Sequence, residues 1–101
     1  NLSKSNFKGA NLSNANFESA LVQEAIFDDT TMLHSNFYHA DISGSKFVNS
    51  QLMHAKFDWS IAVGASFDST NLEYLRAPNA NWKRIKITSS KIFENLAPLI
   101  I

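Results

Sequence analysis

The sequence predicts an all-β fold, a four-sided coil of about 20 residues per turn. A large apolar residue recurs at every fifth position from Leu2 to Leu72, with Ala at position 62, and seven of the eight Phe residues lie in this register. The position two residues before each large residue is small, always Ala, Ser or Thr up to residue 70. Two of every five side chains are therefore expected to point inward, with a spacing that fits neither a single strand nor a helix.

The sides of the coil follow from this spacing. Two inward residues separated by one outward residue form the alternation of a strand, so three residues of each five are expected to be extended. The other two must turn a corner, and Asn, Ser, Gly and Asp are frequent there, as in Ser13-Asn14, Asp28-Asp29 and Ser43-Gly44. These residues favour tight turns because they accept positive φ or bond to nearby backbone groups.

The number of sides follows from the sizes of the inward residues. Three five-residue units per turn, as in a triangular coil, would mix residue sizes within a column, whereas four units per turn sort them. The columns of the first to fourth walls are Leu2, Val22, Ile42 and Ala62; Phe7, Phe27, Phe47 and Phe67; Leu12, Met32, Leu52 and Leu72; and Phe17, Phe37, Phe57 and Ala77. Since one coil cannot bury its inward face alone, neighbouring coils are expected to stack about 4.8 Å apart.

The repeated unit also resembles a known family. The runs ANLSN-ANFES at 10–19 and SNFYH-ADISG-SKFVN at 35–49 are similar to the pentapeptide-repeat family, whose unit is a small residue, Asn or Asp, Leu or Phe, and two variable residues. The resemblance covers residues 1–74 and, more loosely, 75–92. It implies a right-handed, four-sided parallel β-helix, here of about five coils of about 20 residues. Leu75 and Ile85 replace small residues, so we expect the regular helix to loosen between 75 and 85.

The C-terminal part of the chain is less regular in sequence. We divide the chain into a β-helix at 1–80 and a segment at 81–101 that forms an irregular last coil, a C-terminal cap or the lead into a following domain. Ser89-Ser90 before KIFENLA predicts a short capping helix, with Trp82, Phe93 and Ile100 as a lid. In the alternative, the coils continue through Ile87 and Ile92. Because the chain starts within a repeat, we expect it to be part of a longer protein.

Composition narrows the classes of function. Nine acidic and nine basic residues cancel, but residues 1–75 carry eight acids and four bases, whereas residues 76–101 carry five bases and one acid. The balanced total does not indicate a nucleic-acid-binding surface. No Cys is present, which excludes disulfides and thiolate metal sites, and no apolar run is long enough to span a membrane. Cytoplasmic and secreted locations, including secretion into a host cell, are both compatible with the sequence.

Motifs for catalysis are absent from the sequence. There is no Gly-x-Ser-x-Gly, no phosphate-binding Gly-rich loop and no His-Glu-x-x-His. His34 and His54 lie one coil apart and could contact the same ion, but no third metal ligand is evident, so they are interpreted as surface histidines. We therefore expect no enzyme activity, cofactor, metal or small-molecule substrate for this chain.

One wall is predicted to bind a partner. On the fourth wall, the sequence places aromatic and His side chains along both edges, with Tyr38 and Asp58 on the face between them. Aromatic residues and Met are enriched in protein interfaces, although isolated apolar residues are also normal on surfaces. The predicted protein-binding residues are Leu33, His34, Tyr38, His39, Met53, His54, Trp59 and Tyr74. A second candidate group on the first wall, which could contact flanking sequence, is Leu21, Ile61 and Val63.

These features favour a non-catalytic scaffold that presents one wall to a protein partner or an adjoining domain. The resemblance supports this in general terms, since members of the family include domains of bacterial secreted effectors, some with a HECT-like ubiquitin ligase region. The alternative is a DNA mimic that inhibits a type II topoisomerase, as quinolone-resistance members do. Such a mimic needs a long acidic rod, and the zero net charge of this chain argues against it.

Overall fold

The backbone turns a corner at every fifth residue. In the computed structural model, which describes residues 1–92, φ is positive at each fifth position from Lys4 to Ser89. At most corners the carbonyl of the large inward residue accepts a hydrogen bond from the N–H three residues later, as between Phe7 O and Ala10 N at 3.0 Å. A positive φ at the third residue of such a four-residue turn is typical of type II geometry. The predicted corners are therefore confirmed.

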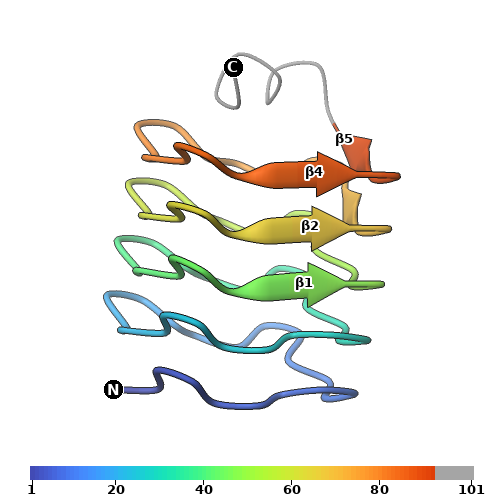
Figure 1. The fold of residues 1–101 in the computed structure, drawn as a ribbon, viewed down its shortest axis with the longest axis horizontal. Helices are drawn as coiled ribbons and strands as arrows, with labels where there is room; N and C mark the ends of the chain where they lie inside the picture. The colour runs from blue at the N-terminus through green and yellow to red at the C-terminus, as the bar shows by residue number, and fades with distance from the viewer. Residues whose placement is uncertain (93–101) are drawn as a thin grey trace.

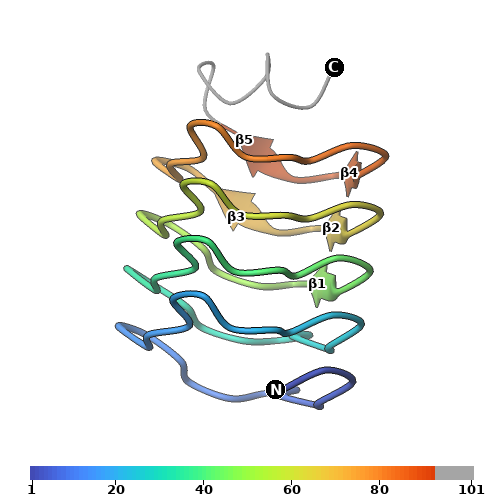
Figure 2. The ribbon, with the colours of Figure 1, turned by 90° about the vertical axis from the view of Figure 1, so that its left-hand side faces the viewer.

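The straight sides pair with the coil above and the coil below. Strands β1 (Lys46–Val48), β2 (Ser66–Asp68) and β4 (Lys86–Thr88) lie one above the other on the second wall (Figure 1). Strands β3 (Asn71–Leu72) and β5 (Lys91–Ile92) pair on the third wall (Figure 2). Every pair is parallel and joins residue i to residue i+20, and the isolated bridges of the earlier coils have the same offset. The predicted four-sided parallel β-helix, with four five-residue units in each coil, is confirmed.

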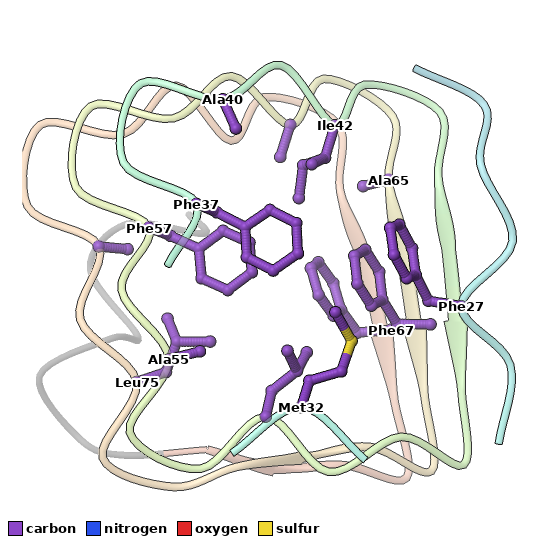
Figure 3. Packing of buried hydrophobic residues seen from close by; sticks show 14 of the residues in the cluster. Phe27, Met32, Phe37, Ala40, Ile42, Ala55, Phe57, Ala65, Phe67 and Leu75 are labelled. Carbon is purple, nitrogen blue, oxygen red and sulfur yellow. The ribbon is translucent and has the colours of Figure 1, made fainter. Parts of the chain in front are cut away.

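The core consists of two stacked aromatic columns that meet in the middle of the coil. On the fourth wall, the rings of Phe37 and Phe57 stack with centroids 4.6 Å apart, and on the second wall Phe47 stacks at 4.8 Å on both Phe27 and Phe67. Rings from the two walls meet edge to face, as for Phe27 and Phe37 at 6.0 Å and 85° (Figure 3). Both geometries are favourable for aromatic pairs. Buried aliphatic residues of the first and third walls, among them Ile42 and Leu52, complete the core.

The small inward positions contribute hydrogen bonds as well as space. The buried Ser45 hydroxyl donates to Val22 O at 2.8 Å and accepts from Ala25 N at 3.2 Å. Ser50 makes a similar bond of 2.6 Å to a carbonyl in the coil below. Ser35 is equally buried, but its Oγ has no hydrogen-bond partner among the described residues. The same residue type thus stabilises one corner and leaves a polar atom unpaired at another.

The ladder does not loosen between residues 75 and 85, where the sequence suggested that it would. Parallel bridges join Lys56 to Arg76 and Ile61 to Asn81, with the same offset as in the earlier coils. Strands β4 and β5 then extend the pairing to residue 92. The alternative of coils continuing through Ile87 and Ile92 therefore describes this part of the chain.

Compensating changes in side-chain size explain why the ladder persists. Leu75 at a small position is 2% exposed and Ala77 at a large position is 3% exposed, so the two have exchanged sizes within one side. Trp82 is buried rather than exposed at the end of the rod, and its ring stacks on Phe67 at 5.4 Å. The Trp82 Nε1–H donates to Ser60 Oγ at 3.0 Å, which satisfies the polar atom of this large core residue.

The end of the chain is outside this description. The predicted capping helix would begin at Lys91, but Lys91–Ile92 form β5, and the rest of the segment, with Phe93 and Ile100, lies outside the described residues. The division at residue 80 stays a prediction. The described residues contain no helix that is long and apolar enough to cross a membrane.

Candidate protein-binding surface

The fourth wall is bordered by two corners that carry the predicted binding residues. We call the corner formed by Leu33-His34, Met53-His54 and Glu73-Tyr74 the histidine edge, and the corner formed by Tyr38-His39, Asp58-Trp59 and Pro78-Asn79 the tryptophan edge. The outward residues between the two edges are Asn16, Asn36, Lys56 and Arg76.

The histidine edge holds three stacked rings. The ring centroids of His34 and His54 are 4.9 Å apart with an interplanar angle of 10°, and those of His54 and Tyr74 are 4.8 Å apart at 7°. All three side chains are exposed, whereas Leu33 and Met53, each one residue earlier in its turn, are half-buried. The coil repeat therefore places five of the eight predicted residues in one row along the rod.

The tryptophan edge holds the other three predicted residues. The rings of His39 and Trp59 are nearly parallel at 5.9 Å, and Tyr38 meets His39 edge to face at 4.4 Å. The prediction that Tyr38 and Asp58 lie on the face of the wall is wrong, because both are turn residues of this edge. In the regular repeat, the residue after the large inward one already belongs to the corner.

Five of these side chains stand at the positive-φ position of their corner. His34, His39, His54, Trp59 and Tyr74 all have φ between 57° and 62°. A left-handed residue costs roughly 1–2 kcal/mol, less for Asn, Asp and His and least for Gly, so the cost applies chiefly to Trp59 and Tyr74. Stacking of aromatic rings stabilises the fold by about 0.5–1.5 kcal/mol per pair, which is similar to this cost. These residues therefore add little or no net stability to the fold. Trp59 and Tyr74 in addition leave 51% of their surface exposed.

The middle of the wall is polar and carries a feature that the sequence did not reveal. The Arg76 guanidinium forms an ion pair with Asp58 in the coil below, with Nη2–Oδ2 and Nε–Oδ1 distances of 2.9 and 3.3 Å. The hydrogen bond to Asp58, followed by its negative charge, raises the pKa of Arg76 above its ordinary value. A shallow depression here is lined by Glu18, Asn36, Tyr38, Lys56, Asp58 and Arg76. Asp58 and Arg76 are separated in the sequence by close to one coil and have opposite charges, and this is the signal that could have predicted their ion pair.

The second candidate group lies around the tryptophan edge, on the first wall. Leu21 and Ile61 are 48% and 42% exposed, and Asp41 separates them in the coil between. Val63 is half-buried, and its backbone N–H donates to Ser43 Oγ at 3.2 Å. Leu21 and Ile61 therefore extend the apolar surface beyond Trp59, whereas Val63 belongs to the next corner.

The described part of the surface holds no group of metal-ligating side chains. Within residues 1–92, no three His, Cys, Asp or Glu side chains are close enough together to hold a metal ion. His34 and His54 stack ring on ring and, in this part of the chain, belong to no such group. What the wall does present is ring edges, the Arg76 guanidinium and half-buried apolar side chains, which are contact groups for a macromolecule.

The comparison with known sequences identifies the family. A sequence profile described as "Pentapeptide repeats (8 copies)" matches residues 1–27 and 17–52. The chain belongs to the pentapeptide repeat family. Its fold is accordingly the right-handed quadrilateral β-helix, which agrees with the parallel ladder described above. A search of curated protein sequences finds no match.

Solved structures of pentapeptide repeat proteins share this fold. A pentapeptide repeat protein from the Arabidopsis thaliana thylakoid lumen is 24% identical, with a TM-score of 0.82 over 84% of this chain and 59% of that one. QnrB1, a plasmid-mediated fluoroquinolone resistance protein, is 14% identical, with a TM-score of 0.58 over 87% of this chain and 53% of that one. The chain therefore spans between half and three-fifths of the length of these two proteins, and at such identities the likeness is one of fold.

Proposed function

We propose that this pentapeptide repeat chain is a non-catalytic scaffold that presents its fourth wall, with the histidine and tryptophan edges, to a protein partner or an adjoining domain. The observation that carries the proposal is the set of five His, Trp and Tyr side chains at positive-φ positions. Positive φ recurs at every fifth residue of this fold, and most of these corners carry Gly, Asn, Asp or Ser. The turn therefore does not require His, Trp or Tyr, yet these types occupy five corners along the two edges of one wall. Binding would use the eight predicted residues together with Arg76.

The chemistry of the wall favours a protein over other ligands. Stacking along the rod covers both faces of the His54 ring and the faces of His34 and Tyr74 that meet it, so that ring edges make up much of what this edge presents. Ring edges of His and Tyr offer hydrogen-bond donors and acceptors rather than flat platforms for bases or sugars. Trp59, Tyr74 and Arg76 are of the residue types that dominate binding energy in protein interfaces.

Substitution at the positive-φ positions separates binding from folding. The double variant Trp59→Asn and Tyr74→Asn removes both side chains but supplies the residue type that Asn49 and Asn79 already provide at equivalent corners. We expect the variant to fold and to lose the partner in affinity capture from cells that express the intact protein. The matched control is Glu24→Asn with Asp29→Asn, at the same turn position on other corners. If the partner is recovered equally with the double variant and with its control, the fourth wall is not the binding surface.

Inhibition of a type II topoisomerase by DNA mimicry is the alternative function. The fold likeness to QnrB1 is the observation that favours it. Against it, the outward residues of the fourth wall are neutral or basic. Within residues 1–92, the acidic residues are divided among all four corners, with Asp41 on the first wall, and they form no continuous face. A gyrase supercoiling assay tests this alternative directly, since a mimic inhibits the enzyme or relieves its inhibition by a fluoroquinolone.

A further inference from the structure

A group of basic side chains lies on the side of the rod opposite the fourth wall. Lys83 and Arg84 form the corner before β4, and Lys86 begins β4 on the second wall (Figure 1). All three side chains are exposed, and within residues 1–92 none of them forms an ion pair. Their backbone is held in the ladder, with Gly64 N donating to Lys83 O and Lys86 N donating to Ala65 O, both at 3.0 Å.

The coil below this basic group is small and uncharged. Val63, Gly64 and Ser66 occupy the positions directly beneath Lys83, Arg84 and Lys86. A Cβ added to Gly64 would meet no atom within 4 Å, so the corner under Arg84 is open. The backbone of a bound chain can therefore approach this corner closely, directly below the three cations.

The positive region has a limited length along the rod. On the corner that carries Lys83 and Arg84, the next acidic side chain is Glu24, three coils lower, which is about 14 Å at the usual strand spacing. On the second wall, the exposed Lys46 lies two coils below Lys86, with Ser66 between them, and adds a fourth cation at the lower end of the region. At the opposite corner of the second wall, Asp68 accepts a hydrogen bond from Thr88 Oγ1 at 2.7 Å. Its negative charge marks how far the positive region extends across this wall. An anion that fits this region is therefore short, with its charges within roughly two coils.

We propose that Lys83, Arg84 and Lys86 bind a short acidic segment of a partner protein, whose backbone passes over the open corner at Gly64. Charge complementarity favours a negatively charged ligand. The short length of the positive region favours a short acidic peptide segment over nucleic acid. Nucleic acid carries charge continuously, one phosphate per about 1.7 Å of duplex, so it would extend beyond the cations toward Glu24 and its neighbours. A segment with three or four consecutive Asp or Glu residues ends before it reaches them. The rod then has two binding faces of different chemistry on opposite walls.

A direct binding measurement tests the proposal. The probe is a fluorescent tetrapeptide of alternating Asp and Glu, and the control probe has Asn and Gln in their place. By fluorescence anisotropy at low salt, we expect the intact chain to bind only the acidic peptide, and added salt to weaken binding. The variant K83E/R84E/K86E is expected to bind it at least about tenfold more weakly, because three exposed charge contacts are lost and reversed.

Controls distinguish this site from general charge effects and from the fourth wall. The variant K4E/K8E/K56E changes the net charge by the same amount elsewhere, and it should bind the acidic peptide within about twofold of the intact chain. K83Q/R84Q/K86Q should give an intermediate loss, with unchanged far-UV circular dichroism as evidence of folding. The double variant W59N/Y74N should bind the acidic peptide as well as the intact chain does. The proposal for the basic group is therefore tested independently of the proposal for the fourth wall.

Three outcomes would overturn the proposal. They are absence of peptide binding by the intact chain at low salt, an equal loss in K4E/K8E/K56E, and tighter binding of a thymidine oligonucleotide of the same charge. The third outcome would instead identify the basic group as a nucleic-acid site.

Discussion

Two buried serines that face the same interior should respond to the same substitution with opposite sign. Ser35 and Ser45 are both fully buried, yet Ser45 bonds to Val22 O and Ala25 N, whereas the Ser35 Oγ has no partner among the described residues. An unpaired buried hydroxyl costs about 1–3 kcal/mol. Ser35→Ala removes that cost and leaves a void of one oxygen, which costs only a few tenths of a kcal/mol. The expected result is a gain in the free energy of unfolding of about 1 kcal/mol.

Ser45→Ala provides the matched comparison. It leaves a buried N–H and a buried carbonyl without the hydroxyl that joins them, so the free energy of unfolding is expected to fall by about 2 kcal/mol or more. Urea unfolding measures both changes, and in thermal unfolding each kcal/mol corresponds to about 4–8 °C for a domain of this size. If Ser35→Ala lowered the stability as Ser45→Ala does, the inference that the Ser35 hydroxyl is unpaired would be refuted.

Two further predictions concern the core and the corners. Phe47→Ala should lower the free energy of unfolding by about 3–5 kcal/mol, because Phe47 is fully buried and stacked on both sides; a loss below about 1 kcal/mol would contradict a continuous aromatic column. Gly44→Ala should destabilise more than Gly64→Ala in the same urea assay. Both have positive φ, at 70° and 73°, but only at Gly44 would the new Cβ crowd a neighbour, Glu24 Cγ at 3.2 Å. Equal losses would show that this contact relaxes without cost.

The sequence was sufficient for the fold because a solenoid has a translational contact pattern. Each residue i pairs with residue i+20, so the column that contains Phe27, Phe47 and Phe67 in the sequence is also a physical stack. Local turn preference and inward residue size both have the five-residue period, and neither depends on distant parts of the chain. In irregular folds, contacts cannot be read from the sequence in this way, because they join segments at unrelated separations along the chain.

The candidate surface was predictable only in part. Its rows of side chains follow from the repeat, and the stacking of His34, His54 and Tyr74 required no more than the column that the coil period defines. The sequence misplaced Tyr38, and it did not reveal the ion pair between Arg76 and Asp58. That pair joins Arg76 at a wall position to Asp58 at a corner position of the coil below. Its geometry depends on which residue begins the corner.

By itself, the sequence determined the period, the number of walls, the composition of the core and the residues left outside it. Only the tertiary structure decided that the ladder continues through residues 75–85, where Leu75 and Ala77 have exchanged sizes and both are buried. It also decided that five of the six aromatic and His side chains of the two edges, all except Tyr38, have positive φ. Backbone conformation and packing volume are properties of several chain segments together, so a one-dimensional pattern of residue types cannot specify them.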